Sequence, residues 1–131
     1  MNIASYPNLS IANTKKGKLP RLPFLKLKNA ILGGKYELSV VFANPAEMRK
    51  LNRIYRGKNK PADVLAFPLS KNNGEIFLCV SEIKKRAGDF GREGDKLAGF
   101  FLIHALVHLK GLSHGSTMEK TEGRFRNAFG I

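Results

Sequence analysis

One apolar stretch, residues 100–115, limits most strongly how this chain can fold. Its first part is hydrophobic at nearly every position, which predicts a helix that is buried almost all round. The chain has three histidines, and all of them lie in this stretch, at His104, His108 and His114. Because residues four apart share a helix face, His104 and His108 are expected to project from one side of this helix.

A glycine follows the expected helix, at Gly111, between the second and the third histidine. Glycine readily adopts the left-handed conformation that ends helices, so the chain can turn there and bring His114 back toward His104 and His108. Imidazoles buried without a partner would be costly, and a shared metal ion satisfies them. The sequence therefore predicts one zinc ion (Zn2+) on these three histidines, with one position left for water. The alternative is three core histidines with satisfied hydrogen bonds.

The spacing from His104 to His114 also matches the zinc-protease pattern His-Glu-x-x-His-x-x-Gly-x-x-His. In that chemistry the glutamate beside the first histidine is the general base, and here Ala105 occupies its position. A methyl group moves no proton, so peptide hydrolysis is disfavoured unless Glu119 or Glu122 reaches the water. Both glutamates are expected on the solvated side of a terminal helix.

The charge of the chain is strongly one-sided. Its 131 residues carry 23 Lys and Arg against 10 Asp and Glu, a formal net charge of +13. Such a field attracts polyanions, among which RNA and DNA are the most abundant in a cell. A phosphodiester is a substrate that a metal and a fixed arginine can hydrolyse. Arg56, in a basic turn before a strand, is the candidate for gripping two phosphate oxygens, and a merely exposed cation is the alternative.

The compartment is expected to be the cytoplasm. A single cysteine, Cys79, lies in an apolar run and is expected to be a small core residue of a reduced protein. The N-terminal residues do not resemble a signal peptide, and no segment has the length and hydrophobicity of a membrane helix.

Local patterns predict one α+β domain over residues 1–131. Strands are expected at residues 3–6, 36–42, 63–68 and 75–80. Helices are expected from Pro20 to the glycines at 33–34, after the N-cap Asn44, from the N-cap Ser81 to about Ala87, from about Asp95, and over residues 118–129. The second of these helices should turn Met48, Leu51, Ile54 and Tyr55 inward. Its Arg49, Lys50 and Arg53 are expected to face solvent or an anionic partner.

Two long motifs of this chain, at residues 104–114 and 55–68, resemble those of the YbeY family of metal-dependent endoribonucleases. The family pattern His-Gly-x-Leu-His-Leu-x-Gly-Tyr-Asp-His is matched by His-Ala-Leu-Val-His-Leu-Lys-Gly-Leu-Ser-His at residues 104–114. A second block, close to Tyr-Arg-Gly-Lys-Asp-x-Pro-Thr-Asp-Val-Leu-Ser-Phe-Pro, is matched at residues 55–68. The resemblance is clearest over residues 36–130.

This resemblance implies a small mixed β-sheet flanked by helices, with a zincin-like three-histidine metal site. It implies zinc on His104, His108 and His114, and catalytic roles for Arg56 and His108. The implied activity is single-strand-specific cleavage of RNA, in maturation of the 16S ribosomal RNA 3′ end and in ribosome quality control. The implied partners are single-stranded ribosomal RNA and a ribosomal subunit or its assembly factors.

The chain departs from the family pattern at several positions. Ala105 replaces the glycine after the first histidine, and Leu112 and Ser113 replace Tyr-Asp before the last. Asn59 stands at an aspartate position, and Ala62 and Ala66 stand at hydroxyl positions. If those groups orient ligands, metal affinity or rate would fall by ~10–100-fold.

Two other functions stay open. A non-catalytic, zinc-stabilised RNA-binding ribosome factor would bind RNA in a salt-dependent way without turnover. A metallopeptidase would cleave peptides. The residues leave open the cleavage position, the metal's identity, the oligomeric state, and whether the metal activates water or the 2′-hydroxyl.

Overall fold

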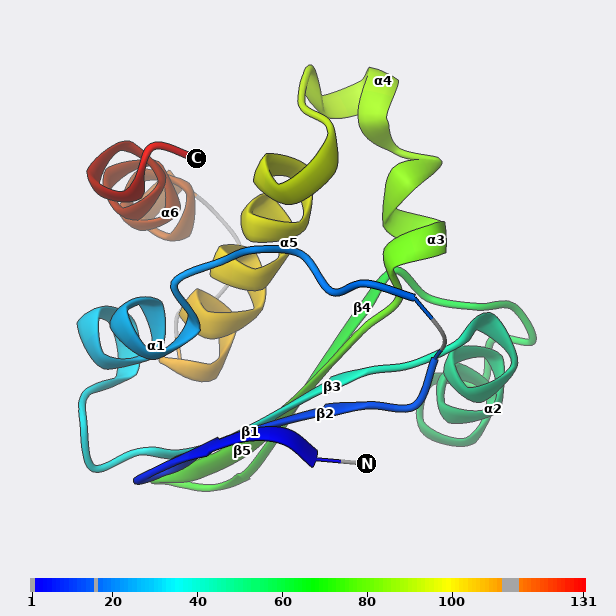
Figure 1. Ribbon diagram of the computed structural model, residues 1–131, viewed down its shortest axis with the longest axis horizontal. Coiled ribbons are helices and arrows are strands. Elements are labelled where there is room, and N and C mark those ends of the chain that lie inside the picture. The colour runs from blue at the N-terminus through cyan, green and yellow to red at the C-terminus, as the bar shows by residue number, and fades with distance from the viewer. Residues whose placement is uncertain (1, 16, 112–115) are drawn as a thin grey trace.

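The computed structural model describes residues 2–15, 17–111 and 116–131 (Figure 1). Five strands are present in these ranges: β1 (Asn2–Tyr6), β2 (Leu9–Asn13), β3 (Glu37–Phe42), β4 (Val64–Ser70) and β5 (Asn73–Leu78). The helices there are α1 (Phe24–Leu32), α2 (Pro45–Arg56), α3 (Val80–Lys84), α4 (Ala87–Phe90), α5 (Gly94–Leu109) and α6 (Ser116–Phe129).

The strands form one mixed sheet in the order β1-β2-β3-β5-β4. The β1–β2 and β4–β5 pairs are antiparallel, whereas β2–β3 and β3–β5 are parallel. The predicted mixed sheet with flanking helices is therefore confirmed. The order leaves β1 and β4 at opposite edges, and β4 is the edge that lies nearest to the candidate site.

Helices α1 and α5 lie along one face of the sheet, with α6 packed beyond α5 (Figure 1). Alternate residues of the central strands, such as Val40, Ile76 and Leu78, point into this layer and are almost fully buried. Helix α5 fills the middle of the core: ten of its residues are buried, among them Leu102, Ile103, Leu106 and Val107. The prediction of a buried helix carrying two histidines is confirmed.

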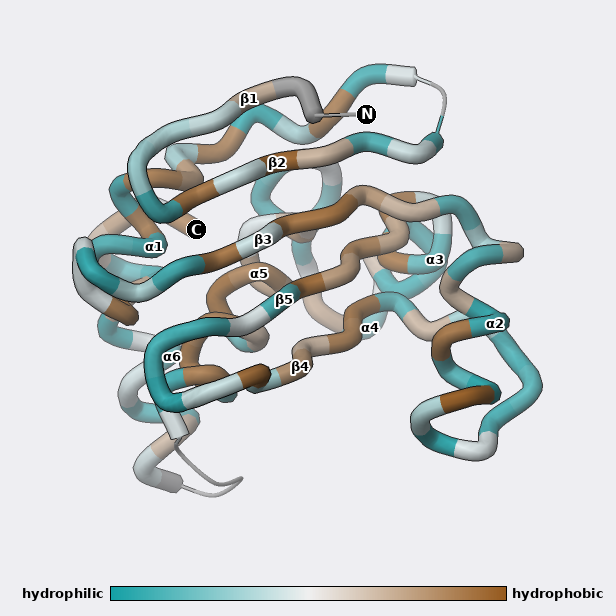
Figure 2. The backbone as a smooth tube through the Cα atoms, turned by 90° about the horizontal axis from the view of Figure 1, so that it is seen from below, coloured by the Kyte–Doolittle hydropathy of each residue, from teal (hydrophilic) through white to brown (hydrophobic). Residues whose placement is uncertain are grey.

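The opposite face is covered at one end by α2 (Figure 2). A smaller apolar cluster lies there, formed by Ala43, Met48, Leu65 and Cys79, with Phe67 and Phe77 packed against it. The predicted start of α2 is confirmed: the Asn44 side chain accepts from the Glu47 N–H, and the Glu47 carboxylate accepts from the Asn44 N–H. Cys79 is buried, as predicted.

The structure corrects the predicted helix at residues 81–87. It begins at Val80, with the extended Cys79 rather than Ser81 before it, and α3 ends at Lys84. A separate short helix, α4, then runs to Phe90 and stops at Gly91, whose φ is 61°. Strand β2 was not predicted, because its five residues form a strand by pairing with the distant β3.

The inward orientation predicted for the second half of α2 is wrong. Met48 is fully buried and Leu51 is partly buried, but Ile54 is 58% exposed and Tyr55 is 65% exposed. Asn52 is buried in their place, and its side-chain amide donates to the Lys60 carbonyl at 2.9 Å. The last turn of α2 therefore presents an isoleucine and a tyrosine to solvent.

The central strand β5 should carry much of the stability of the sheet. Ile76 is fully buried between β3 and β4, and its side chain faces the α5 layer. We expect Ile76→Ala to lower the free energy of unfolding by about 2–5 kcal/mol, through lost burial and an unfilled cavity. Leu69→Ala on β4 is the control, since Leu69 is 55% exposed and should change stability little. Urea denaturation compares the two, and equal midpoints would contradict this placement of the core.

In the part of the chain that the structure describes, no helix combines the length and apolar character needed to cross a membrane.

Candidate active site

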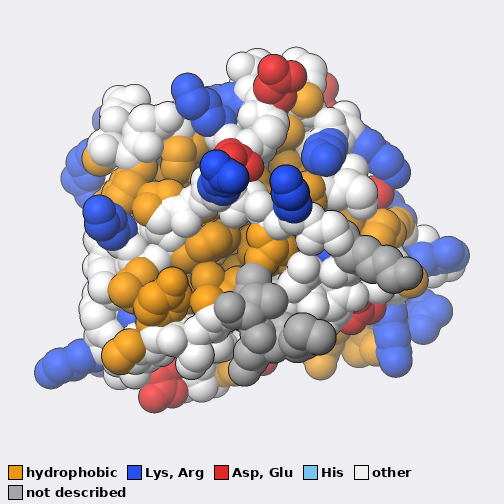
Figure 3. All heavy atoms as spheres, viewed as in Figure 1, with side chains coloured by type: hydrophobic (Ala, Val, Ile, Leu, Met, Phe, Trp, Pro, Cys, Tyr) orange, Lys and Arg blue, Asp and Glu red, His pale blue; other side chains and the backbone are white. Residues whose placement is uncertain are grey.

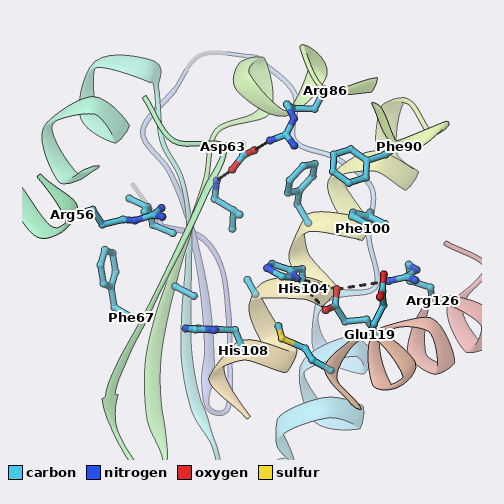
Figure 4. A pocket seen from close by; sticks show the side chains of 17 residues that line it. Arg56, Asp63, Phe67, Arg86, Phe90, Phe100, His104, His108, Glu119 and Arg126 are labelled. Carbon is cyan, nitrogen blue, oxygen red and sulfur yellow. Dashed lines mark hydrogen bonds and ion pairs between the residues drawn. The ribbon is translucent and has the colours of Figure 1, made fainter. Parts of the chain in front are cut away.

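A cavity of about 880 Å³ opens between α5, α6 and the edge strand β4 (Figure 4). Its walls combine histidines, arginines, carboxylates and aromatic rings. The lining residues are Arg56, Asp63, Val64, Leu65, Ala66, Phe67, Arg86, Phe90, Phe100, Phe101, His104, Ala105, His108, Met118, Glu119, Glu122 and Arg126. Two of the three predicted ligands and the predicted arginine thus line one cavity.

His104 and His108 lie one turn apart on the face of α5 that borders the cavity. The His104 side chain is 35% exposed, and His108 is exposed. From Phe101 to Leu109 these histidines are the two residues of α5 that are not buried, and both line the cavity.

Glu122 holds the ring of His104. Both carboxylate oxygens of Glu122 lie 3.1 Å from Nδ1 of His104. In the neutral imidazole, donation from Nδ1 to this carboxylate places the lone pair on Nε2. Histidines that bind metals are commonly fixed in this way by a carboxylate on the other ring nitrogen. The prediction that Glu122 is solvated is wrong, because its side chain is only 8% exposed.

Arg126 forms an ion pair with the buried carboxylate of Glu122. Its Nη1 lies 3.7 Å from Glu122 Oε1, one helical turn along α6, and its guanidinium lies 4.9 Å from the centre of the Phe100 ring. The ion pair compensates the negative charge of Glu122 inside the protein. His104, Glu122 and Arg126 thus form a connected polar chain along one wall of the cavity.

Arg56 reaches the cavity from the other side of β4. It is the last residue of α2, because Gly57 turns the chain there with a φ of 69° and donates its N–H to the Arg53 carbonyl. Figure 4 shows the Arg56 side chain across β4 from α5, near the ring of Phe67. Arg56 therefore lines the same cavity as the two histidines, from a different helix.

Asp63 and Arg86 join the start of β4 to the end of α3. Arg86 Nη1 donates to Asp63 Oδ2 at 2.7 Å, and Asp63 Oδ1 accepts the Val64 N–H at 2.7 Å. Arg86 also packs over the Phe90 ring at 5.1 Å. These contacts fix one end of the cavity and occupy the Asp63 carboxylate.

The residues that differ from the family pattern fit their surroundings wherever the structure describes them. Ala105 is buried beside the histidines, and Ala66 is partly buried and lines the cavity. Ala62 packs against the smaller apolar cluster, while Asn59 accepts a hydrogen bond from Arg49 Nε at 2.9 Å. Leu112, Ser113 and His114 lie outside the described residues.

The helix turn predicted at Gly111 is confirmed. Helix α5 ends at Leu109, and Gly111 has a φ of 94° and donates its N–H to the His108 carbonyl. Within residues 2–15, 17–111 and 116–131, no three His, Cys, Asp or Glu side chains are grouped as metal ligands.

Comparison with known proteins agrees with the motifs. The YbeY family model, described as endoribonuclease YbeY, matches residues 15–127. The endoribonuclease YbeY of Petrotoga mobilis is 30% identical over 128 residues, which cover 95% of this chain and 87% of that protein. The endoribonuclease YbeY of Staphylococcus carnosus is 32% identical over 98 residues, 66% of this chain, and the chain spans only 64% of that relative's length.

A solved structure supports the same relationship. The solution structure of a Thermotoga maritima protein superposes with a TM-score of 0.67 and 29% sequence identity, over 93% of this chain and 89% of that one. Sequence motifs, a family match over most of the chain and a shared architecture agree. This chain belongs to the YbeY family.

Proposed function

We propose that this protein is an endoribonuclease that cleaves single-stranded RNA, with the cavity between α5, α6 and β4 as its active site. Family membership supports the reaction class. The observation that carries the proposal within this chain is the joint lining of one cavity by His104, His108 and Arg56.

We propose that one zinc ion is held by His104, His108 and His114. The described residues fit such an ion: two imidazoles face one cavity a helical turn apart, and Glu122 fixes the tautomer of one of them. When bound, zinc would supply a Lewis acid that stabilises negative charge and lowers the pKa of water.

The chain's own residues then have separate tasks. The Glu122 carboxylate accepts a hydrogen bond from Nδ1–H of His104 and so leaves the lone pair of Nε2 available to the cavity. Arg56 provides a planar fork of donors that can grip two oxygens of a phosphodiester as negative charge develops. The aromatic and aliphatic walls, including Phe67, Phe100 and Met118, limit the access of bulk water to that phosphate.

Ribosomal RNA is the proposed substrate, in maturation of the 16S RNA 3′ end and in ribosome quality control. The proposal follows from the resemblance of the two motifs, and includes a cytoplasmic location and contact with a ribosomal subunit or its assembly factors. The basic surface supports an RNA partner: Lys and Arg side chains are spread over the face in Figure 3, with few acidic ones among them.

Cleavage of matched RNAs tests the reaction. The purified chain should cut a single-stranded oligoribonucleotide from the 16S 3′ region and leave its fully paired duplex intact, as followed by gel electrophoresis. Salt-dependent binding without any cutting would favour a zinc-stabilised RNA-binding factor. Cutting of casein without RNA cleavage would favour a metallopeptidase, for which Glu119 on the cavity wall would be the candidate base.

Glu122 provides a sharper test of the metal site. We expect Glu122→Leu to weaken zinc binding by about 10–100-fold, because the ring of His104 loses the acceptor that orients it. Glu122→Gln, which retains an accepting oxygen, should lose less. Competition with a coloured zinc chelator measures both affinities.

The control variant is Glu82→Gln. This carboxylate pairs with Lys85 at 2.8 Å and is not part of the cavity wall. Zinc affinities that are the same for Glu122→Leu and Glu82→Gln would reject a metal-positioning role for Glu122.

A further inference from the structure

We propose that Tyr55 and Phe67 form a stacking site for an unpaired nucleobase, next to the phosphate position at Arg56. We call Tyr55, Arg56 and Phe67 the α2 shelf. The proposal rests on the endoribonuclease function proposed above and adds to it a base-binding site outside the metal-bearing wall.

Tyr55 is the most exposed large hydrophobic side chain in the described part of the chain, at 65% exposure. Its position in the amphipathic pattern of α2 predicts burial, yet the last turn of the helix extends beyond the smaller apolar cluster. Its ring is still held in place, since its centre lies 5.1 Å from that of Phe67, at an interplanar angle of 53°. Tyr55 is thus a supported aromatic ring with much of its surface open.

Phe67 connects this tyrosine to the cavity. Phe67 lines the cavity with Arg56 and His108, and its ring packs edge to face against Phe77, with the ring centres 5.8 Å apart and an interplanar angle of 71°. Figure 4 shows Phe67 and Arg56 on the same side of β4, with His108 across the strand. A strand whose phosphate is gripped by Arg56 would therefore place a neighbouring base at Tyr55.

The charge around the shelf selects a polyanion. Every charged residue between Met48 and Ala62 is a cation, and those on α2 and its following loop are exposed: Arg49, Lys50, Arg53, Arg56, Lys58 and Lys60. An exposed aromatic ring among such cations is the combination that binds single-stranded nucleic acid, through base stacking and phosphate contacts. A base that stacks on Tyr55 must be unpaired, so the shelf would also disfavour duplex RNA.

Binding of a fluorescent single-stranded decaribonucleotide tests the shelf. Every protein in this experiment also carries His108→Ala so that the RNA is not cut during the measurement. Gel electrophoresis verifies that the strand stays intact. Adding Tyr55→Ala should weaken binding by about 5- to 100-fold, the range for loss of one aromatic stack. Tyr55→Phe should stay within about two-fold, because the ring is kept. The slope of log affinity against log salt should not change, because no phosphate contact is removed.

A matched control and a base-specific readout complete the test. Tyr6 is also exposed, at 45%, but lies on β1 at the opposite edge of the sheet, so Tyr6→Ala should bind normally. In a series of RNAs that each lack one base at a different position, the loss of one particular base should weaken binding to the His108→Ala chain. When Tyr55→Ala is added, the loss of that base should no longer weaken binding.

Failure of the shelf and failure of the proposed function give different results. The shelf is wrong and the nuclease assignment stands if the unmodified chain cleaves the RNA while, in the His108→Ala chain, adding Tyr55→Ala leaves binding unchanged or leaves the abasic penalty in place. If the unmodified chain neither binds nor cleaves RNA, both proposals are overturned.

Discussion

Replacing His108 by alanine should reduce single-stranded RNA cleavage by at least about a thousand-fold. His108 is exposed to the cavity one turn after His104, so the substitution removes a proposed ligand without opening the core. Loss of the metal would remove both the Lewis acid and the charge that stabilises the transition state. Single-turnover cleavage of a labelled oligonucleotide measures the effect.

Two further measurements make this result specific. RNA binding by His108→Ala should persist, because the 23 Lys and Arg side chains that attract the phosphates are all retained. Lys96→Ala, an exposed position on the same helix that does not line the cavity, should cleave normally. Cleavage by His108→Ala at the unmodified rate would assign the activity elsewhere, such as to a contaminating nuclease.

Replacing Arg56 by alanine should lower the cleavage rate by about 100–1,000-fold while zinc binding stays unchanged. The arginine reaches the cavity from α2 and belongs to a different element from the proposed metal ligands. Removing a donor that is fixed near developing negative charge costs about this much in rate. Arg56→Lys should recover only part of it, since a lysine carries the charge but lacks the planar fork.

The matched control for Arg56 is Arg53→Ala. Arg53 lies one turn earlier on α2, is exposed, and does not line the cavity. Both substitutions should reduce the salt dependence of RNA binding slightly if both cations contact phosphates. Only Arg56→Ala should slow the chemical step. Equal rates for the two variants under saturating RNA would remove Arg56 from the catalytic site.

The sequence predicted the elements whose signals are local. The continuous apolar run of α5 predicted its burial, Gly111 predicted its turn, and Asn44 with Glu47 predicted the cap of α2. The two motifs predicted the family. Sequence could not place β2, because this strand depends on parallel pairing with β3, across an intervening helix.

Sequence reasoning placed Glu122 on the wrong face of its helix. A glutamate is usually solvated, and this one was assigned to the outer face of the terminal helix. A signal was nevertheless available, because Met118, Glu122, Phe125 and Phe129 follow one helical stripe, and a carboxylate on an apolar stripe requires a partner. The partner, His104, lies on another helix, so only the tertiary structure identifies it.

Tyr55 was misplaced for the opposite reason. The apolar spacing of α2 predicts an inward-facing tyrosine, but the apolar cluster beneath this helix is small and ends before its last turn. The spacing of apolar residues shows which face of a helix is apolar. It does not show how far the neighbouring sheet extends beneath that face. The exposed ring is therefore a product of packing.

Stepwise return of zinc to the metal-free protein tests the central claim most directly. Cleavage of single-stranded RNA should be absent after chelation and should rise in proportion to added zinc until one equivalent is bound. The His104→Ala and His108→Ala variants should show neither the tight equivalent nor the recovery. Full cleavage by the metal-free chain, or one tightly bound zinc that restores no cleavage, would contradict the account.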